Sequence, residues 1–136
     1  MKLLLDTNII IEIITKRKDY KESLQILRNC EANIVEGFVT ATTITDLMYI
    51  LRKHIDPENV RETVQKLLLV IDVAGVLKSD ILAAFIIGIK DYEDAVQASC
   101  AGRIKADYIV TRNDKDFIGS PIPAILPSDA LKLLKQ

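Results

Sequence analysis

The sequence predicts an α/β fold in which a parallel sheet of four to five short strands carries helices on both faces. Short apolar runs alternate along the chain with segments whose apolar residues recur at helical spacing, a pattern typical of a parallel sheet with crossover helices. The chain has 136 residues, of which 49% are hydrophobic, enough for one ordinary domain with a buried core. No repeat, low-complexity tract or linker divides it, so we expect a single domain over residues 1–136.

In the first half of the chain, strand and helix signals follow one another directly. The leucines at 3–5 predict a buried strand, and isoleucines between 9 and 14 continue at helical spacing. A helix from Tyr20 that ends before Gly37, a strand over 38–41 and a helix through 44–51 come next. Another helix is expected to begin at 56–58, because the proline there is tolerated in a first turn and the flanking acids favour the positive end of a helix.

The second half repeats this alternation. Residues 67–73 predict the end of that helix and a third strand, and Ser79 with Asp80 is expected to cap a helix that continues to Gly88. The strongest helix signal opens at Asp91, with a stripe of small side chains that permits close approach to a neighbouring element. A β-rich run at 108–111 predicts a further strand, and a last helix is expected over 128–134.

Composition limits the function. The 18 basic and 19 acidic residues nearly cancel, which argues against a protein that coats nucleic acid by broad phosphate neutralisation. The two cysteines lie far apart without metal-binding spacing, so we expect reduced thiols. Without a signal-peptide pattern or an apolar run near ~20 residues, the sequence predicts a soluble, cytoplasmic protein.

Four aspartates are predicted at the carboxyl edge of the parallel sheet, where such sheets bind ligands. Asp6 follows the first strand directly and Asp116 follows the strand near 108–111, so both fall at the carboxyl edge, where open α/β sheets bind ligands. Asp46 and Asp94 are expected in the first turns of helices that start from this edge. The sequence therefore predicts that four carboxylates from distant segments converge.

Converging carboxylates require a counter-charge, because two like charges ~4 Å apart repel by roughly 4 kcal/mol at an effective dielectric of about 20. With oxygen ligands and only one histidine in the chain, the expected cofactor is Mg²⁺ or Mn²⁺ rather than zinc. Such an ion polarises a phosphodiester and activates water for hydrolysis. Asn8, Thr111 and Asn113 are placed to orient ligands or water, and Arg112 is the one nearby cation expected to contact phosphate.

Each acid also has a structural explanation. Asp46 follows Thr43 and Asp94 follows Asp91 at the spacing of a capping box. Asp6 is also suited to cap the first helix, and Asp116 is equally suited to a turn. Taken singly, Asp46 and Asp94 are explained better by capping than by catalysis, whereas for Asp6 and Asp116 the two explanations are about equal. The hypothesis rests on the convergence of the four acids.

Three segments resemble the PIN-domain family: LLLDTNIII, TATTITDLMYIL and DYEDAVQASCAGRIKADYIVTRNDKDF. The resemblance covers nearly the whole chain and implies a parallel α/β fold whose acid quartet binds Mg²⁺ or Mn²⁺ to cleave single-stranded RNA. Motif by motif, the quartet falls on Asp6, Asp46, Asp94 and Asp116, with Asp91 and Asp114 as neighbouring alternatives. At Asp46 the family more usually carries glutamate, so the shorter side chain changes the reach to a metal.

Many small prokaryotic PIN proteins are toxins of toxin–antitoxin pairs, and the resemblance implies an antitoxin partner and a homodimer. The leading hypothesis is an endoribonuclease in which Asp6, Asp94 and Asp116 hold metal and Asp46 completes the acidic pocket. The alternative is a noncatalytic PIN-like module that binds RNA or protein through a degenerate metal site. A phosphatase with Asp6 as nucleophile is weaker, because Asn8 stands where a second aspartate is expected.

Overall fold

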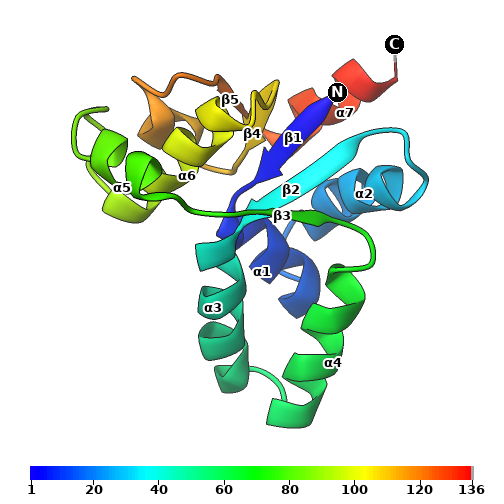
Figure 1. The fold of residues 1–136 in the computed structure, drawn as a ribbon. Coiled ribbons are helices and arrows are strands. Elements are labelled where there is room, and N and C mark those ends of the chain that lie inside the picture. The colour runs from blue at the N-terminus through cyan, green and yellow to red at the C-terminus, as the bar shows by residue number, and fades with distance from the viewer. Residues whose placement is uncertain (136) are drawn as a thin grey trace.

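The computed structural model describes residues 1–135 and contains a sheet of five parallel strands (Figure 1). The strands stand in the order β3-β2-β1-β4-β5, with β1 in the centre. Their bounds are Lys2–Leu5 for β1, Glu36–Thr40 for β2, Asp72–Ala74 for β3, Tyr108–Val110 for β4 and Ala124–Ile125 for β5. The predicted fold class is confirmed.

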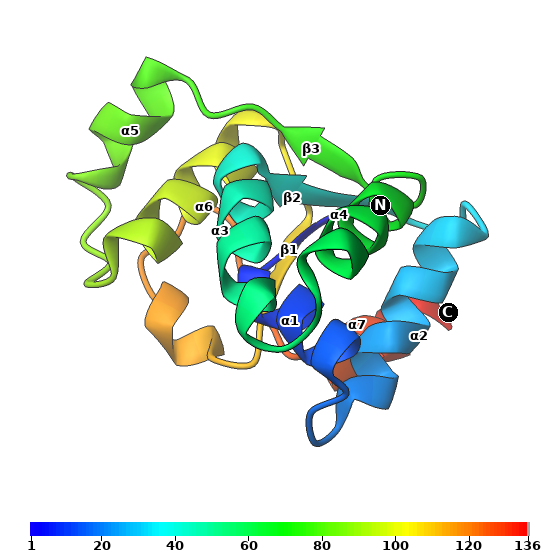
Figure 2. The same ribbon diagram turned by 90° about the horizontal axis from the view of Figure 1, so that it is seen from below.

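Helices cover both faces of the sheet. α1 (Thr7–Thr15), α2 (Tyr20–Glu31) and α7 (Pro127–Leu134) pack on one face, and α5 (Lys78–Ala84) and α6 (Tyr92–Arg103) pack on the other (Figure 1). α3 (Ala41–Ile50) and α4 (Pro57–Leu67) extend as a pair beyond the carboxyl edge of the sheet (Figures 1 and 2). Two 3₁₀ turns complete the fold, η1 (Leu51–Lys53) directly after α3 and η2 (Asp114–Phe117) after β4.

The three leucines of β1 explain why this strand lies at the centre. Leu3 and Leu5 pack into the cluster shared with α1, α2, α3 and α4, whereas Leu4 packs into the cluster shared with α6. Successive side chains of a strand point to opposite faces, and a strand covered on both faces needs a continuous apolar run. All three leucines are buried.

Some boundaries differ from those predicted. α3 begins at Ala41, because the hydroxyl of Thr40 caps it by accepting a hydrogen bond from the amide of Thr43 at 3.3 Å. Asp46 therefore lies in the second turn of α3, and the predictions that it stands in a first turn and forms a capping box with Thr43 are wrong. This places the Asp46 carboxylate further along the helix, away from the strand end.

The region from β3 to α6 also departs from the prediction. α5 ends at Ala84 instead of continuing to Gly88, which has a positive φ of 85°, a conformation that interrupts a helix. Asp80 caps α5 from its third position, where it accepts a hydrogen bond from the Leu77 amide at 2.9 Å. β5 has only two residues in a proline-rich segment and left no periodic signal in the sequence.

None of the helices within residues 1–135 is long and apolar enough to cross a membrane.

Candidate active site

A cavity of about 270 Å³ opens at the carboxyl edge of the sheet. It is surrounded by the end of β1, the start of α1, the end of α3, the start of α6 and η2. Most of its lining residues are polar or acidic, and they are Asp6, Thr7, Asn8, Ile11, Ile50, Asp91, Glu93, Asp94, Asn113 and Asp116. Three of the four predicted acids therefore meet in one cavity, although they are far apart in the sequence.

Asp6 is the most deeply buried of these acids, at 3% exposure. It occupies the N-cap position of α1 but its side chain makes no capping hydrogen bond. Instead, Oδ2 accepts a hydrogen bond from the Thr111 hydroxyl at 2.8 Å, and Oδ1 accepts one from Gln97 Nε2 at 3.3 Å. Burial raises the pKa of Asp6, and these two hydrogen bonds partly oppose that rise. The carboxylate is thus held in a fixed orientation at the base of the cavity.

Asp94, the third residue of α6, is half-buried beside Asp6. Burial and then the carboxylates of Asp6, Asp91 and Asp116, in that order, together raise the pKa of Asp94 to about 7. The capping role predicted as an alternative for this motif falls to Asp91, whose Oδ1 accepts a hydrogen bond from the Asp94 amide at 3.0 Å. Asp94 therefore contributes a carboxylate to the cavity without having to cap the helix.

Asp46 does not line the cavity, and its neighbour is Glu93. Burial, followed by the neighbouring carboxyl of Asp46 and then by Asp91 and Asp6, raises the pKa of Glu93 to about 7. Glu93 reaches the cavity while Asp46 stands behind it.

The remaining predicted residues divide into two groups. Asn8 and Asn113 line the cavity, and Thr111 contacts Asp6. Arg112 is oriented away from the cavity, because its Nη2 donates to Glu12 Oε2 at 2.7 Å and its Nε donates to Glu12 Oε1 at 3.0 Å. Its guanidinium also forms an ion pair with Glu22 at 3.4 Å, so it is engaged in holding α1 and α2 to the end of β4.

Sequence reasoning missed Gln97 and Glu93. Gln97 is 1% exposed, and its Oε1 has no hydrogen-bond partner within residues 1–135. The signal in the sequence was a long polar side chain three residues after Asp94, within the stripe of small residues that packs against the sheet. For Glu93 the signal was its position beside Asp94 at a predicted helix start.

A family model for the PIN domain matches residues 2–115. The chain belongs to the PIN-domain family. A comparison with curated protein sequences finds no significant match.

Several solved structures share this PIN fold. VapBC2 from Rickettsia felis bound to a DNA fragment from its promoter is similar with a TM-score of 0.72 and 20% identity, over 93% of this chain and 98% of that one. FitAcB from Neisseria gonorrhoeae gives a TM-score of 0.72 and 16% identity with the same coverage. A toxin–antitoxin complex from Klebsiella pneumoniae gives 0.70 and 23%, over 92% of this chain and 97% of that one.

The lining of this PIN-domain cavity suits a hard divalent cation in its donor chemistry. Every charged lining side chain is a carboxylate, and no histidine or cysteine takes part, which is the ligand set that Mg²⁺ and Mn²⁺ prefer. Within the described part of the chain, however, no three such side chains stand close enough together to hold an ion as they are placed. The carboxylates must move toward one another to close on a metal.

Proposed function

We propose that this PIN domain is a metal-dependent endoribonuclease that hydrolyses phosphodiester bonds of single-stranded RNA, and that it acts as the toxin of a toxin–antitoxin pair. The observation that carries the proposal is the meeting of Asp6, Asp94 and Asp116 in one cavity. These acids come from β1, α6 and η2, and neither turn nor cap formation explains why Asp6 and Asp94 lie side by side at an energetic cost. Membership of the family supports the same reading.

In this proposal Asp6, Asp94 and Asp116 hold Mg²⁺ or Mn²⁺, and Asp46 completes the acidic group through its contact with Glu93. A bound divalent ion supplies the positive charge that a phosphodiester and its attacking water need during hydrolysis. The fit rests on the all-oxygen lining and on the raised pKa of Asp94, to which burial contributes most and the repulsion from Asp6, Asp91 and Asp116 contributes next. A cation removes that repulsion.

The surrounding polar residues then have defined tasks. Thr111 and Gln97 fix the two oxygens of Asp6 from opposite sides, which is the role that partners of ligating carboxylates commonly play. Asn8 and Asn113 stand at the cavity wall, and their side-chain amides carry both donors and acceptors for water and for phosphate oxygens.

The test uses two neighbouring aspartates of η2 as a matched pair. Asp116 lines the cavity and Asp114 does not, so Asp116→Asn and Asp94→Asn should abolish cleavage of a fluorescent single-stranded RNA while Asp114→Asn retains it. Cleavage by the wild type should require Mg²⁺ or Mn²⁺ and stop in EDTA. If Asp116→Asn and Asp114→Asn cut the RNA at the same rate as the wild type, the assignment of the site is wrong.

A second candidate is a noncatalytic PIN module, and the placement of Asp46 favours it. This carboxyl is paired with Glu93, and no three acids in residues 1–135 stand in metal-binding geometry. Calorimetric titration with Mn²⁺ separates the two candidates. The nuclease should show a binding site that disappears in Asp94→Asn, whereas the module should show none.

We further propose two protein partners, an antitoxin and a second copy of the chain. For the antitoxin, the support is that one structural neighbour, from Klebsiella pneumoniae, is a toxin–antitoxin complex. For the second copy, the support is the apolar surface of α5 and the loop after it, where Leu82, Phe85 and Ile86 are 54%, 72% and 84% exposed. A neutral apolar surface of this kind is typical of an interface.

Light scattering tests self-association through this surface. Ile86→Glu should convert a dimer to a monomer, and Ile34→Glu, at an exposed apolar residue on another part of the chain, should not. If both variants keep the mass of the wild-type dimer, the dimer forms through a different surface.

A further inference from the structure

The acidic cavity has no positive charge with which to hold a nucleic acid. Its lining contains five carboxylates and no lysine or arginine, and Arg112 is engaged by Glu12 and Glu22. Each nucleotide of a bound RNA brings a negative charge, and affinity for RNA depends on cations that neutralise phosphates. If the chain binds RNA at this cavity, the cations must therefore lie beside it.

Beside the cavity, α3 and η1 carry an exposed aromatic ring with two cations over it. The Tyr49 side chain is 59% exposed, with Arg52 Cζ at 5.0 Å and Lys53 Nζ at 5.6 Å from its ring centroid. Both cations are exposed, and within residues 1–135 neither forms an ion pair with an acid. Their charge is thus available to a ligand.

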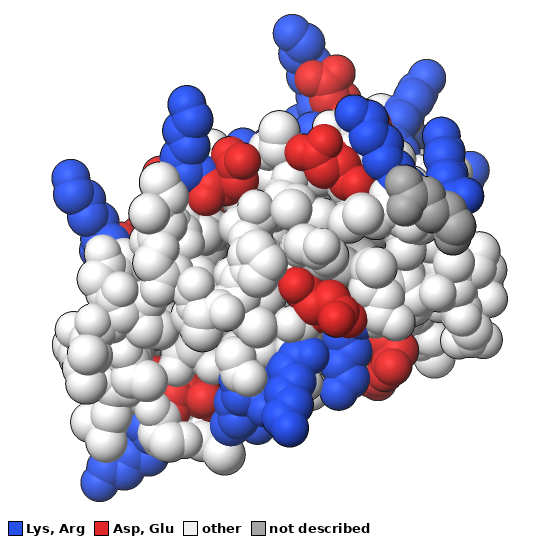
Figure 3. All heavy atoms as spheres, turned by 90° about the horizontal axis from the view of Figure 1, so that it is seen from above, with Lys and Arg blue, Asp and Glu red and all other residues white. Residues whose placement is uncertain are grey.

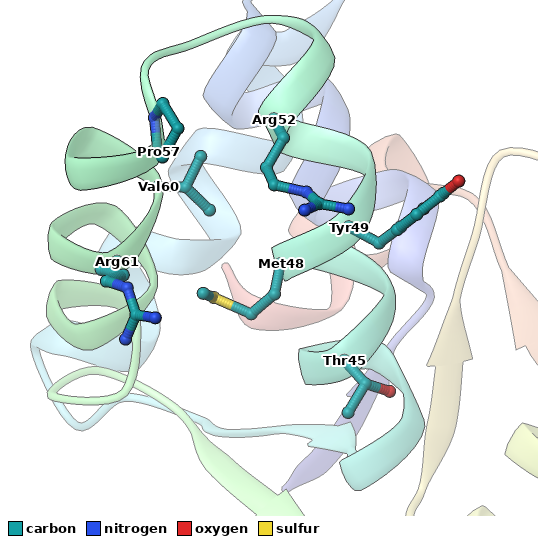
Figure 4. A pocket seen from close by; sticks show the side chains of 7 residues that line it. All are labelled: Thr45, Met48, Tyr49, Arg52, Pro57, Val60 and Arg61. Atoms are coloured by element: carbon teal, nitrogen blue, oxygen red, sulfur yellow. The ribbon is translucent and has the colours of Figure 1, made fainter.

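Tyr49 and Arg52 border a groove of about 390 Å³ between α3 and α4 (Figure 4), and Lys53 stands next to it in sequence, over the Tyr49 ring. Met48 points across the groove toward α4, where Val60 faces it, and Arg61 adds a third cation from α4 (Figure 4). Arg61 is exposed and, within residues 1–135, also forms no ion pair. The groove thus combines an apolar floor with one arginine from η1 and one from α4.

The same helix separates this groove from the acidic cavity. Ile50 lines the cavity and Asp46 contacts Glu93 there, whereas Met48 and Arg52 line the groove. Tyr49 follows Asp46 by three residues, which is about 5 Å along a helix axis. α3 lies between α4 and the start of α6 (Figure 2), and Tyr49 points away from α4 (Figure 4). A chain that leaves the cavity over α3 reaches Tyr49 first and the arginines next.

By contrast, the opposite end of the molecule offers no comparable surface. Figure 3 shows the face seen from above, where lysines and arginines lie in small groups among acids, mainly around the rim of a mostly uncharged centre. The combination of unpaired cations and an exposed aromatic ring is therefore placed next to the acids.

We propose that Tyr49, Arg52, Lys53 and Arg61 form the surface that binds single-stranded RNA on its way into the acidic cavity. A base stacks on the Tyr49 ring, and the three cations hold neighbouring phosphates. Stacking on an exposed ring requires an unpaired base, which selects single strands over duplexes. This inference rests on the proposed function, since it names the residues that would hold the substrate of that site.

Binding is measured in EDTA, where cleavage does not interfere, by fluorescence anisotropy of a labelled unstructured 12-nucleotide RNA at several salt concentrations. Tyr49→Leu should weaken binding about 5- to 10-fold without changing the salt dependence, because loss of base stacking carries no charge. Tyr49→Phe keeps the ring and should bind like the wild type. Both substitutions are at an exposed position, and thermal unfolding checks that the variants remain folded.

The cations predict a different signature. Arg52→Gln should reduce the slope of log affinity against log salt by about 0.7, the value for one phosphate contact on a single strand. Arg28→Gln is the matched control, because Arg28 is an exposed arginine on α2 that lines neither the groove nor the cavity, and its slope should equal that of the wild type. A duplex of the same sequence should bind without dependence on Tyr49.

The inference is overturned if Tyr49→Leu and Arg52→Gln bind the RNA with wild-type affinity and salt slope, which would leave the groove to a protein partner. It is also overturned if the duplex depends on Tyr49 as strongly as the single strand does. If the wild-type protein binds RNA in this manner but does not cleave it, only the nuclease proposal is refuted and the binding surface stands. The two failures are therefore distinguishable.

Discussion

Burial of Asp94 beside other carboxylates should make the metal-free protein less stable as pH rises, and the raised pKa of Asp94 allows the size of this effect to be worked out. Its pKa is raised from the ordinary 3.8 to about 7, so the folded state binds this proton more tightly than the unfolded state. Stability from such a group is fully present below the unfolded pKa and is lost as pH rises through the folded pKa. Between pH 5 and pH 8 the protein should therefore lose stability.

The magnitude follows from the shift. A rise of this size corresponds to about 4 kcal/mol for a fully buried group, and about two-thirds of it falls between pH 5 and 8. Because Asp94 is only half-buried, screening by solvent reduces the expected loss to about 1 kcal/mol. Asp94→Asn removes the titrating carboxyl. Between pH 5 and pH 8 the free energy of unfolding of this variant should therefore decrease by about 1 kcal/mol less than that of the wild type.

Urea unfolding in EDTA at pH 5, 6, 7 and 8 measures the difference directly. Asp72→Asn is the control, because Asp72 is an exposed acid on β3 outside the cavity, and it should follow the wild-type pH profile. Adding Mn²⁺ at pH 8 should stabilise the wild type and leave Asp94→Asn unchanged. If wild type and Asp94→Asn keep parallel profiles from pH 5 to pH 8, the repulsion inferred from the geometry does not exist.

Three further predictions concern the support of the site and the core. Gln97→Met removes a buried donor to the first acid of the site and should lower cleavage about 10-fold, as loss of such partners commonly does, with circular dichroism unchanged. Arg112→Gln leaves Glu12, which is 5% exposed, without its ion pair. The free energy of unfolding measured in urea should fall by about 3 kcal/mol. The decrease should be smaller in the double variant that also carries Glu12→Gln. Gly37→Ala places a Cβ 2.6 Å from Cys30 Sγ and should lower the free energy of unfolding by about 1–3 kcal/mol through overpacking. Adding Cys30→Ala should restore most of the lost stability. Equal stability of Gly37→Ala and wild type would contradict this packing.

The fold was predictable because its signals are local. The leucines of β1 are buried on both faces, and a strand in that position must be continuously apolar. The error at the start of α3 arose where two nearby residues could each cap the same helix. Thr40 and Thr43 are both suitable caps for α3, and the structure shows that Thr40 takes this role. That shift of three residues moved Asp46 by almost one helical turn.

The site was predictable in part for a related reason. Strand ends in a parallel sheet share one edge, so the positions of Asp6 and Asp116 followed from the predicted strands alone. Gln97 could not be found in this way, because its contact with Asp6 joins residues separated by 91 positions. Arg112 was predicted to contact the substrate because it is close to the site in sequence. In the structure its guanidinium binds Glu12, which is 100 positions away and could not be identified as its partner from the sequence.

The arrangement of charge around α3 follows one physical requirement. A lysine or arginine inside the cavity would pair with Asp6 or Asp94, and an acid paired in this way has less affinity for a cation. The arginine nearest in sequence to the site is neutralised by Glu12 and Glu22, while the unpaired arginine Arg52 stands across α3 from the acids. Separation by one helix thus lets a chain with a net charge of −1 keep an acidic cavity and a basic groove side by side, and neither cancels the other.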